Sequence, residues 1–135
     1  MIAVTPGQAG DSPALGPLLA ELRVPRLGPG RPRTRPDALR ADKAYSSRAT
    51  REHLRTRAIT AVIPEPADQI RHRKNRGNTG GRPPAFDAED YKGRNVIERA
   101  FNVLKQWRGL ATRYDKHALT YRAGLVLAAI LSWLK

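Results

Sequence analysis

Hydrophobic and polar positions along the chain alternate between short strand-like runs and longer helical patterns. Apolar runs at residues 2–5, 38–42 and 59–63 are typical of strands. Between the last two, Ser46 or Ser47 can cap a helix that extends to about residue 57. The order of strand, helix and strand predicts parallel strands in an α/β sheet.

Two further stretches have a helical pattern. Near the N-terminus, a turn at residues 6–10 precedes a short helix that Asp11 or Ser12 can cap. From about residue 87 one helix is predicted to about residue 113, and a second from about 119 to 134. The last apolar run is shorter than the roughly 20 residues needed to cross a bilayer, so a buried helix is expected. Trp107 and Trp133 lie on apolar helical faces and are predicted to belong to the core.

Segments rich in Arg, Pro and Gly interrupt these elements at about residues 23–37 and 71–84. Such segments have too few apolar side chains to build a packed core. Both are therefore predicted to be basic loops, the second of them mobile.

Composition limits the classes of function. The chain has 135 residues, a formal net charge of +13, three His and no Cys. This length suits one domain, and the charge favours a nucleic-acid partner. Without Cys there are no disulfides or thiolate metal sites, so any metal is expected to be held by carboxylates. The N-terminus lacks the pattern of a secretory signal, which predicts a cytoplasmic protein.

The positive charge is concentrated in two places. Residues 23–57 contain eleven Arg or Lys against three acidic residues, and residues 71–82 contain five against none. Side chains of this kind neutralise phosphates and give sequence-independent affinity for DNA. The alternative is a solvated run of charge that only improves solubility.

One face of the predicted helix after residue 87 carries chemically active side chains. At about 100° per residue, five of them fall within an arc of roughly 80°: Tyr91, Arg94, Glu98, Phe101 and Lys105. The apolar residues between them point to the opposite side, which predicts a packed face there: Val96, Ile97, Ala100, Val103, Leu104 and Trp107. From periodicity alone, the alternative is a solvated polar face with an Arg94–Glu98 pair that contributes about 0.3 kcal/mol.

The spacing of Tyr91, Arg94, Glu98 and Lys105 resembles the signature of bacterial insertion-sequence transposases of the DDE superfamily, of the insertion-sequence four/five type. The residues that follow, at 106–110 and 113–116, are also similar to that family. The resemblance implies that Glu98 is the third catalytic carboxylate. It further implies that Tyr91, Arg94 and Lys105 line the DNA-facing side of the same helix.

Residues 41–47 resemble the family motif that contains the second catalytic aspartate, which identifies Asp42 with that residue. On the sequence pattern alone, Asp42 is equally well explained as a loop aspartate that caps the next helix. Residues 4–12 resemble the family segment just after the strand that bears the first aspartate. That aspartate is therefore expected before residue 1, because Asp37 does not match its motif and Asp11 is better explained as a helix cap.

The resemblance implies an α/β fold, namely a partial ribonuclease H-like fold with a truncated sheet and a long C-terminal helical part. Residues 1–135 would be the C-terminal portion of a DDE catalytic domain. Mg²⁺ or Mn²⁺ held by Asp42 and Glu98 would support two-metal phosphoryl transfer on transposon and target DNA. Further DNA contacts are expected from basic side chains near these positions: Lys43, Arg71, Arg73, Lys74 and Arg76.

The expected function is DNA transposition by a cytoplasmic, nucleoid-associated bacterial protein that forms a homo-oligomer or pairs with a full-length transposase. Without the first aspartate, the chain alone is expected to be inactive in cleavage. One alternative is a non-catalytic DNA-binding remnant or regulator of a full-length transposase. Another is an unrelated basic protein, such as a ribosomal component, in which the spacing around Glu98 is a coincidence.

Overall fold

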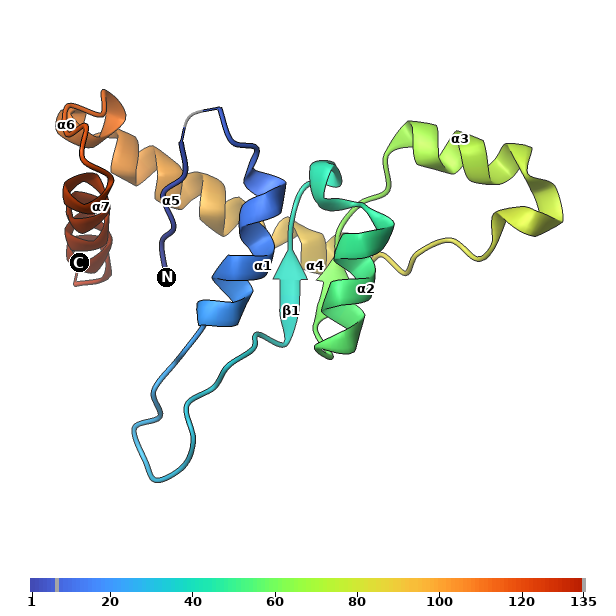
Figure 1. The fold of residues 1–135 in the computed structure, drawn as a ribbon, viewed down its shortest axis with the longest axis horizontal. Helices are drawn as coiled ribbons and strands as arrows, with labels where there is room; N and C mark the ends of the chain where they lie inside the picture. The colour runs from blue at the N-terminus through green and yellow to red at the C-terminus, as the bar shows by residue number, and fades with distance from the viewer. Residues whose placement is uncertain (7, 135) are drawn as a thin grey trace. The chain divides into compact units, whose positions relative to one another are not determined.

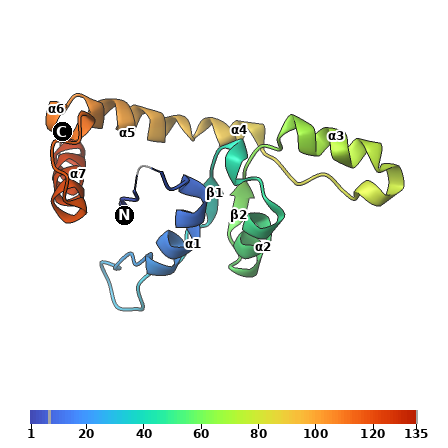
Figure 2. The ribbon, with the colours of Figure 1, turned by 45° about the horizontal axis from the view of Figure 1, so that its top comes forward.

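The computed structural model describes residues 1–6 and 8–134, which divide into two units. The strand-containing unit is Arg23–Arg94. The helical unit is Met1–Leu22 together with Asn95–Lys135. Figures 1 and 2 show the elements of each unit.

Two short parallel strands form the sheet of the strand-containing unit. β1 (Ala38–Arg40) pairs with β2 (Thr60–Val62), and Leu39 lies opposite Ala61. The helix α2 (Arg48–Thr56) connects them and lies beside β2 in both views (Figures 1 and 2). The predicted order of strand, helix and parallel strand is confirmed, because parallel strands need a crossover and α2 provides it.

The start of α2 and the packing behind it follow from local chemistry. Ser47 is the N-cap, and its Oγ accepts a hydrogen bond from the backbone N–H of Thr50 at 3.0 Å. Leu54 of α2 and Ile63 after β2 are completely buried, and Ile59 and Val62 are nearly so. These four aliphatic side chains are the core of the unit, and their removal from water is the main force that holds α2 on the sheet.

The rest of the strand-containing unit is built from short elements: η1 (Lys43–Tyr45), α3 (Ala67–Asn75), η2 (Gly77–Gly80) and α4 (Ala88–Lys92). The prediction of a basic loop at 71–84 is wrong in its first half, which is helical. The prediction at 23–37 is confirmed, since that segment contains a single antiparallel bridge between Val24 and Arg33 and is otherwise irregular.

The helical unit contains α1 (Asp11–Glu21), α5 (Asn95–Lys105), α6 (Arg108–Ala111) and α7 (Ala118–Trp133). The helix predicted at 119–134 is confirmed as α7, but the expectation that it is buried is wrong, because Ala128 is the one buried residue among those described in it. The strand predicted at 2–5 is wrong, because no described strand pairs with those residues. Asp11 is not the cap of α1 either: Gly10 is the N-cap, and Asp11 is the first helical residue.

The single helix predicted from 87 to 113 is wrong, because its hydrogen bonding is interrupted twice. After α4, the N–H groups of Gly93 and Arg94 donate to carbonyls three residues back instead of four. Trp107 has an extended backbone, with φ −83° and ψ 98°, which ends the helical path again. The predicted polar stripe is therefore divided between α4, the turn after it and α5.

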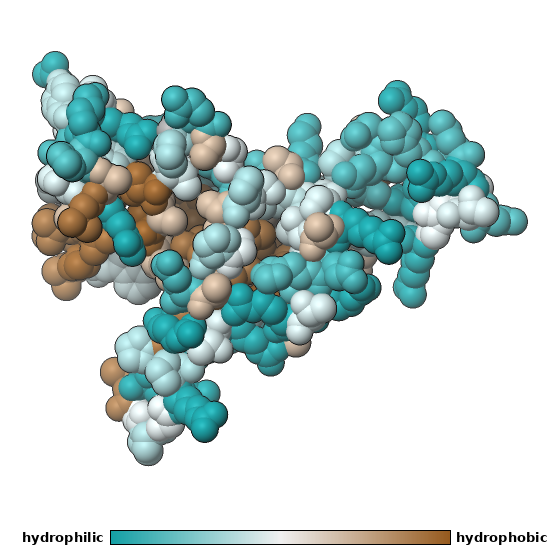
Figure 3. Space-filling view, viewed as in Figure 1, coloured by the Kyte–Doolittle hydropathy of each residue, from teal (hydrophilic) through white to brown (hydrophobic). Residues whose placement is uncertain are grey.

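Most of the apolar face predicted to be packed is exposed, and of its six residues Leu104 alone is half-buried. Val96, Ile97 and Trp107 have exposed fractions of 58%, 53% and 46%, and Trp133 reaches 91%. The prediction that both tryptophans are core residues is wrong, since Trp107, the N-cap of α6, and Trp133, in the last turn of α7, are both exposed. Figure 3 shows hydrophobic surface around α7 of the helical unit.

Packing inside the helical unit joins α6 to α7. The hydroxyl of Tyr121 donates to the carbonyl of Leu110 at 3.1 Å, and the guanidinium of Arg113 lies 4.9 Å from the centre of the Tyr121 ring. Gly124 allows a close approach, because a Cβ atom there would lie 3.1 Å from a methyl carbon of Leu110. No described helix is long and apolar enough to cross a membrane.

Candidate functional site

Asp42 lies just beyond β1, where the chain turns into η1. It is the N-cap of η1, and one carboxylate oxygen, Oδ1, accepts a hydrogen bond from the backbone N–H of Ala44 at 2.9 Å. Asp42 therefore caps the short η1, whereas the longer helix predicted after it, α2, is capped by Ser47. Capping uses one oxygen of a carboxylate that has two, so it does not by itself exclude metal ligation.

Glu98 lies in the first turn of α5 and is exposed. It belongs to the helical unit, whereas Asp42 belongs to the strand-containing unit. Within residues 1–6 and 8–134, no group of three or more His, Cys, Asp or Glu side chains is arranged to hold a metal ion. The pairing of Asp42 with Glu98 therefore stays a prediction.

The other members of the predicted stripe are also divided. Tyr91 lies in α4, where its ring contacts that of Phe86 with centroids 5.4 Å apart. Arg94 follows in the turn after α4, and Lys105 is the exposed last residue of α5. Tyr91 and Arg94 thus belong to one unit, and Lys105 belongs with Glu98 to the other.

The basic residues predicted to contact DNA differ in their accessibility. Lys43, Arg71, Lys74 and Arg76 are exposed. Arg73 is half-buried and forms an ion pair with Glu65. Four of the five are therefore accessible to a large anion, while Arg73 already has a carboxylate partner.

A surface pocket of about 640 Å³ lies between α2, α3 and the segment after η2 in the strand-containing unit. Six arginines line it: Arg48, Arg51, Arg55, Arg73, Arg76 and Arg82. Two glutamates, Glu52 and Glu65, are the acidic residues of its lining. The pocket is therefore strongly cationic.

Sequence reasoning did not single out four of these arginines, Arg48, Arg51, Arg55 and Arg82, although the spacing of the first three was informative. Arg48, Arg51 and Arg55 recur at intervals of three and four residues, which places them on one face of α2. Arg51 differs from the other two in being half-buried. That difference comes from tertiary packing and has no signal in the spacing.

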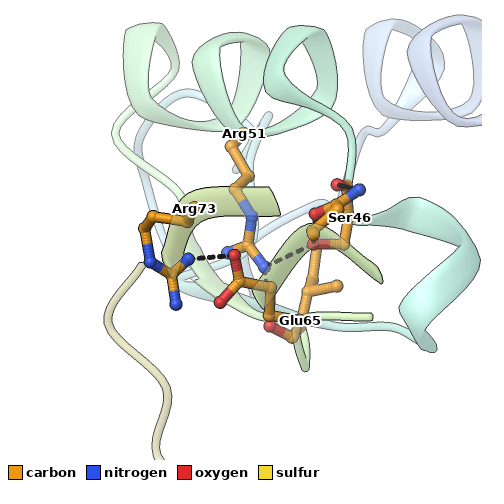
Figure 4. A network of polar contacts seen from close by, with 6 residues as sticks. Ser46, Arg51, Glu65 and Arg73 are labelled. Atoms are coloured by element: carbon orange, nitrogen blue, oxygen red, sulfur yellow. Dashed lines mark hydrogen bonds and ion pairs between the residues drawn. The ribbon is translucent and has the colours of Figure 1, made fainter. Parts of the chain in front are cut away.

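A polar network closes the inner end of the pocket (Figure 4). Arg51 Nη2 donates to Ser46 Oγ and to the carbonyl of Ile63, each at 2.8 Å. Gln69 Nε2 donates to the carbonyl of Ser46 at 2.9 Å. Ser46 is only 3% exposed, so this end is fixed by buried polar contacts.

Burial of Arg51 in this network affects the pKa of its guanidinium. Burial lowers the pKa of the Arg51 guanidinium from its usual value, and the carboxylate of Glu65 acts in the opposite direction. Arginine remains charged at neutral pH because its ordinary pKa is so high. Figure 4 shows Arg51 and Arg73 both directed toward Glu65.

Comparison with known proteins agrees with the resemblance drawn from the sequence. The family model for a transposase DDE domain matches residues 1–133. A Brucella ovis protein named as a transposase for insertion sequence element IS6501 is 32% identical over 134 residues, which cover 99% of this chain and 87% of that protein. No solved structure matches the chain.

Proposed function

Because the chain belongs to the DDE superfamily of insertion-sequence transposases, we propose that it binds transposon DNA and contributes Asp42 and Glu98 to metal-dependent strand cleavage and transfer. The observation that carries this proposal is the position of Asp42, directly after a strand of a parallel pair. Side chains at the carboxyl ends of parallel strands are the usual place for ligands in α/β folds. The proposed fold is ribonuclease H-like, and β1 and β2 are part of its sheet.

Mg²⁺ or Mn²⁺ is the proposed cofactor. Such ions favour oxygen ligands, and a pair of them would activate the attacking hydroxyl and stabilise the leaving oxygen of the DNA strand. Asp42 would offer the carboxylate oxygen that does not cap η1, and Glu98 would offer an exposed carboxylate. Each unit supplies one carboxylate, so the proposal requires both units and a further acidic ligand.

DNA affinity in this proposal comes from the exposed cations. Lys43, Arg71, Lys74 and Arg76 belong to the strand-containing unit, and Lys105 to the helical unit. Tyr91 and Arg94 complete the proposed DNA-contacting set. The proposed setting is the bacterial cytoplasm at the nucleoid, with self-association or pairing with a full-length transposase.

A second function is favoured by one observation. The described residues offer no group of three metal-ligating side chains. A chain that binds transposon DNA without cutting it, as a remnant or a regulator of a full-length transposase, would need none.

Three assays on the full chain separate these functions. Binding to duplex DNA is measured across a range of salt concentrations, Mg²⁺-dependent nicking is measured on the same DNA, and the affinity of the chain for Mg²⁺ is measured by itself. Asp42→Asn and Glu98→Gln are the test variants, because both keep the side-chain shape and remove the charge. Asp68→Asn and Glu89→Gln are matched controls on exposed helical positions.

Nicking that is lost in both test variants and kept in both controls would support the catalytic role. Because the catalytic proposal needs a further acidic ligand, absence of nicking alone does not separate the two functions. Salt-dependent DNA binding together with an equal Mg²⁺ affinity in the natural chain, Asp42→Asn and Glu98→Gln would establish the non-catalytic alternative. Absence of salt-dependent binding would overturn both functions.

A further inference from the structure

The arginines that line the pocket between α2 and α3 outnumber the carboxylates that pair with them. Among the described residues, none forms a salt bridge with Arg48, Arg76 or Arg82. Arg55 is 3.8 Å from Glu52, and both side chains are more than half exposed, so this pair is weak. Several guanidinium groups at the rim are therefore available to an incoming anion.

The inner end of the pocket also offers donors. Both hydrogen bonds that Arg51 makes come from Nη2. A guanidinium has five N–H groups, so those on Nε and Nη1 remain for a ligand. Because Ser46 Oγ and the carbonyl of Ile63 fix its orientation, Arg51 would lose little side-chain entropy on binding.

The lining indicates which anion the pocket suits. It contains six arginines and one histidine, His72, but no Phe, Tyr or Trp side chain, and Pro84 is its one proline. Base stacking needs aromatic surface, whereas the planar fork of arginine matches the oxygens of a phosphate. The lining therefore favours a phosphodiester group over a nucleobase.

We propose that this pocket binds the phosphate backbone of DNA, with Arg51 at its inner end and Arg48, Arg55 and Arg76 at its rim. This inference rests on the proposed DNA-binding function and assigns it a site. It also assigns a role to Glu65. The Glu65 carboxylate pairs with Arg73 inside the pocket, where the two side chains are 15% and 19% exposed. A phosphate that enters competes with this carboxylate for Arg73.

Gly80 lies in the lining of the pocket. A Cβ atom at this position would clash with the carbonyl oxygen of Arg73, and the backbone would have to move to relieve the clash. The turn after α3 can therefore approach Arg73 only with glycine at this position. Replacement by alanine would displace η2 from α3 and open the pocket.

The test uses the full chain and a fluorescent DNA duplex, with anisotropy measured at several salt concentrations. The rim variant Arg48→Gln with Arg76→Gln is expected to weaken binding by about tenfold or more and to reduce the salt slope by roughly 2, close to one per phosphate contact removed. Glu65→Gln is expected to strengthen binding several-fold, since the internal competitor loses its charge. Arg108→Gln with Arg122→Gln removes the same charge from exposed positions of the helical unit and is the matched control.

A second measurement follows the side-chain resonances of Arg51 and Gln69 by NMR as inorganic phosphate is added. Shifts confined to these groups, and absent in the rim variant, support direct phosphate binding. The opposing result is that phosphate shifts these resonances in the natural chain while the rim variant binds DNA as tightly as the natural chain does. That result would overturn DNA as the ligand of the pocket and assign the pocket to a free anion.

If the rim and control variants weaken DNA binding equally, the pocket is not the site, although the proposed DNA binding stands. If the unaltered chain binds no DNA in a salt-dependent way, it is the proposed function that fails. Circular dichroism of each variant separates loss of binding from loss of folding.

Discussion

Arg40 at the end of β1 contacts Asp90 of α4 in two ways. Its Nε donates to the backbone carbonyl of Asp90 at 2.9 Å, and its Nη2 forms an ion pair with the Asp90 carboxylate. The two residues are fifty positions apart in the sequence. This contact connects the strand that leads to Asp42 with the helix that carries Tyr91.

Removing either partner should destabilise the strand-containing unit. The side chains are 40% and 33% exposed, so solvent screens the pair, and we expect a coupling of roughly 0.5–1 kcal/mol. A double-mutant cycle of Arg40→Ala and Asp90→Ala, measured by urea unfolding, gives this value. A coupling near zero at low salt would show that the contact does not stabilise the unit.

The effect of replacing Gly93 by alanine should depend on the side chain of Arg40. The backbone of Gly93 is helical, with φ −60°, so alanine should stabilise the turn by up to about 1 kcal/mol. However, a Cβ there would lie 3.2 Å from Arg40 Nε and 3.1 Å from the carbonyl oxygen of Asp90. We expect Gly93→Ala to be neutral or destabilising in the natural chain.

The same substitution should become less unfavourable once Arg40 is replaced by alanine, because the contact with the Arg40 side chain is then removed while that with the Asp90 carbonyl stays. The free energy of unfolding of Gly93→Ala in both backgrounds checks this. An equal effect in the two backgrounds would contradict the contact between Gly93 and Arg40.

Two substitutions at Asp42 can separate its role as the N-cap of η1 from the role of its carboxylate charge. Asparagine keeps an oxygen that can accept from the N–H of Ala44, whereas alanine does not. We expect Asp42→Ala to lower the free energy of unfolding by about 1 kcal/mol and Asp42→Asn to change it by much less. Thermal unfolding of both variants measures the difference. Equal losses would mean that the carboxylate charge, and not the cap, stabilises η1.

The core of the strand-containing unit depends on Leu54 and Ile63, both completely buried. Leu54→Ala should cost about 2–5 kcal/mol and Ile63→Val about 0.5–1.5 kcal/mol, since each leaves a cavity in proportion to the atoms removed. Leu27→Ala is the control, because Leu27 is fully exposed. Urea denaturation should rank the three variants in that order.

The ion pair between Asp37 and Arg33 should stabilise the folded chain less at acid pH. The hydrogen bond and charge of Arg33 hold the pKa of Asp37 below its usual value. A carboxyl group with a depressed pKa in the folded chain contributes stability above its unfolded pKa, and the contribution disappears as pH falls through the folded pKa. NMR titration should show the Asp37 pKa rising toward its ordinary value in Arg33→Gln. An unchanged pKa would contradict the Arg33–Asp37 interaction.

Local chemistry in the sequence determined several elements of this protein. The β-branched run at 59–63 and the serine pair before α2 predicted a strand and a capped helix, because both depend on neighbours within a few residues. The identity and spacing of Tyr91, Arg94, Glu98 and Lys105 also indicated the transposase family, which the family model confirms.

Only the tertiary structure decided which helical residues are covered and which polar groups meet. Periodicity predicted a packed face on α5 and buried tryptophans, yet Val96 and Trp133 are exposed in the part of the chain that the structure describes. Periodicity also could not show that Arg51 would be half-buried against Ser46, or that Glu65 would pair with Arg73. Burial and pairing depend on segments distant in sequence, and local patterns carry no information about them.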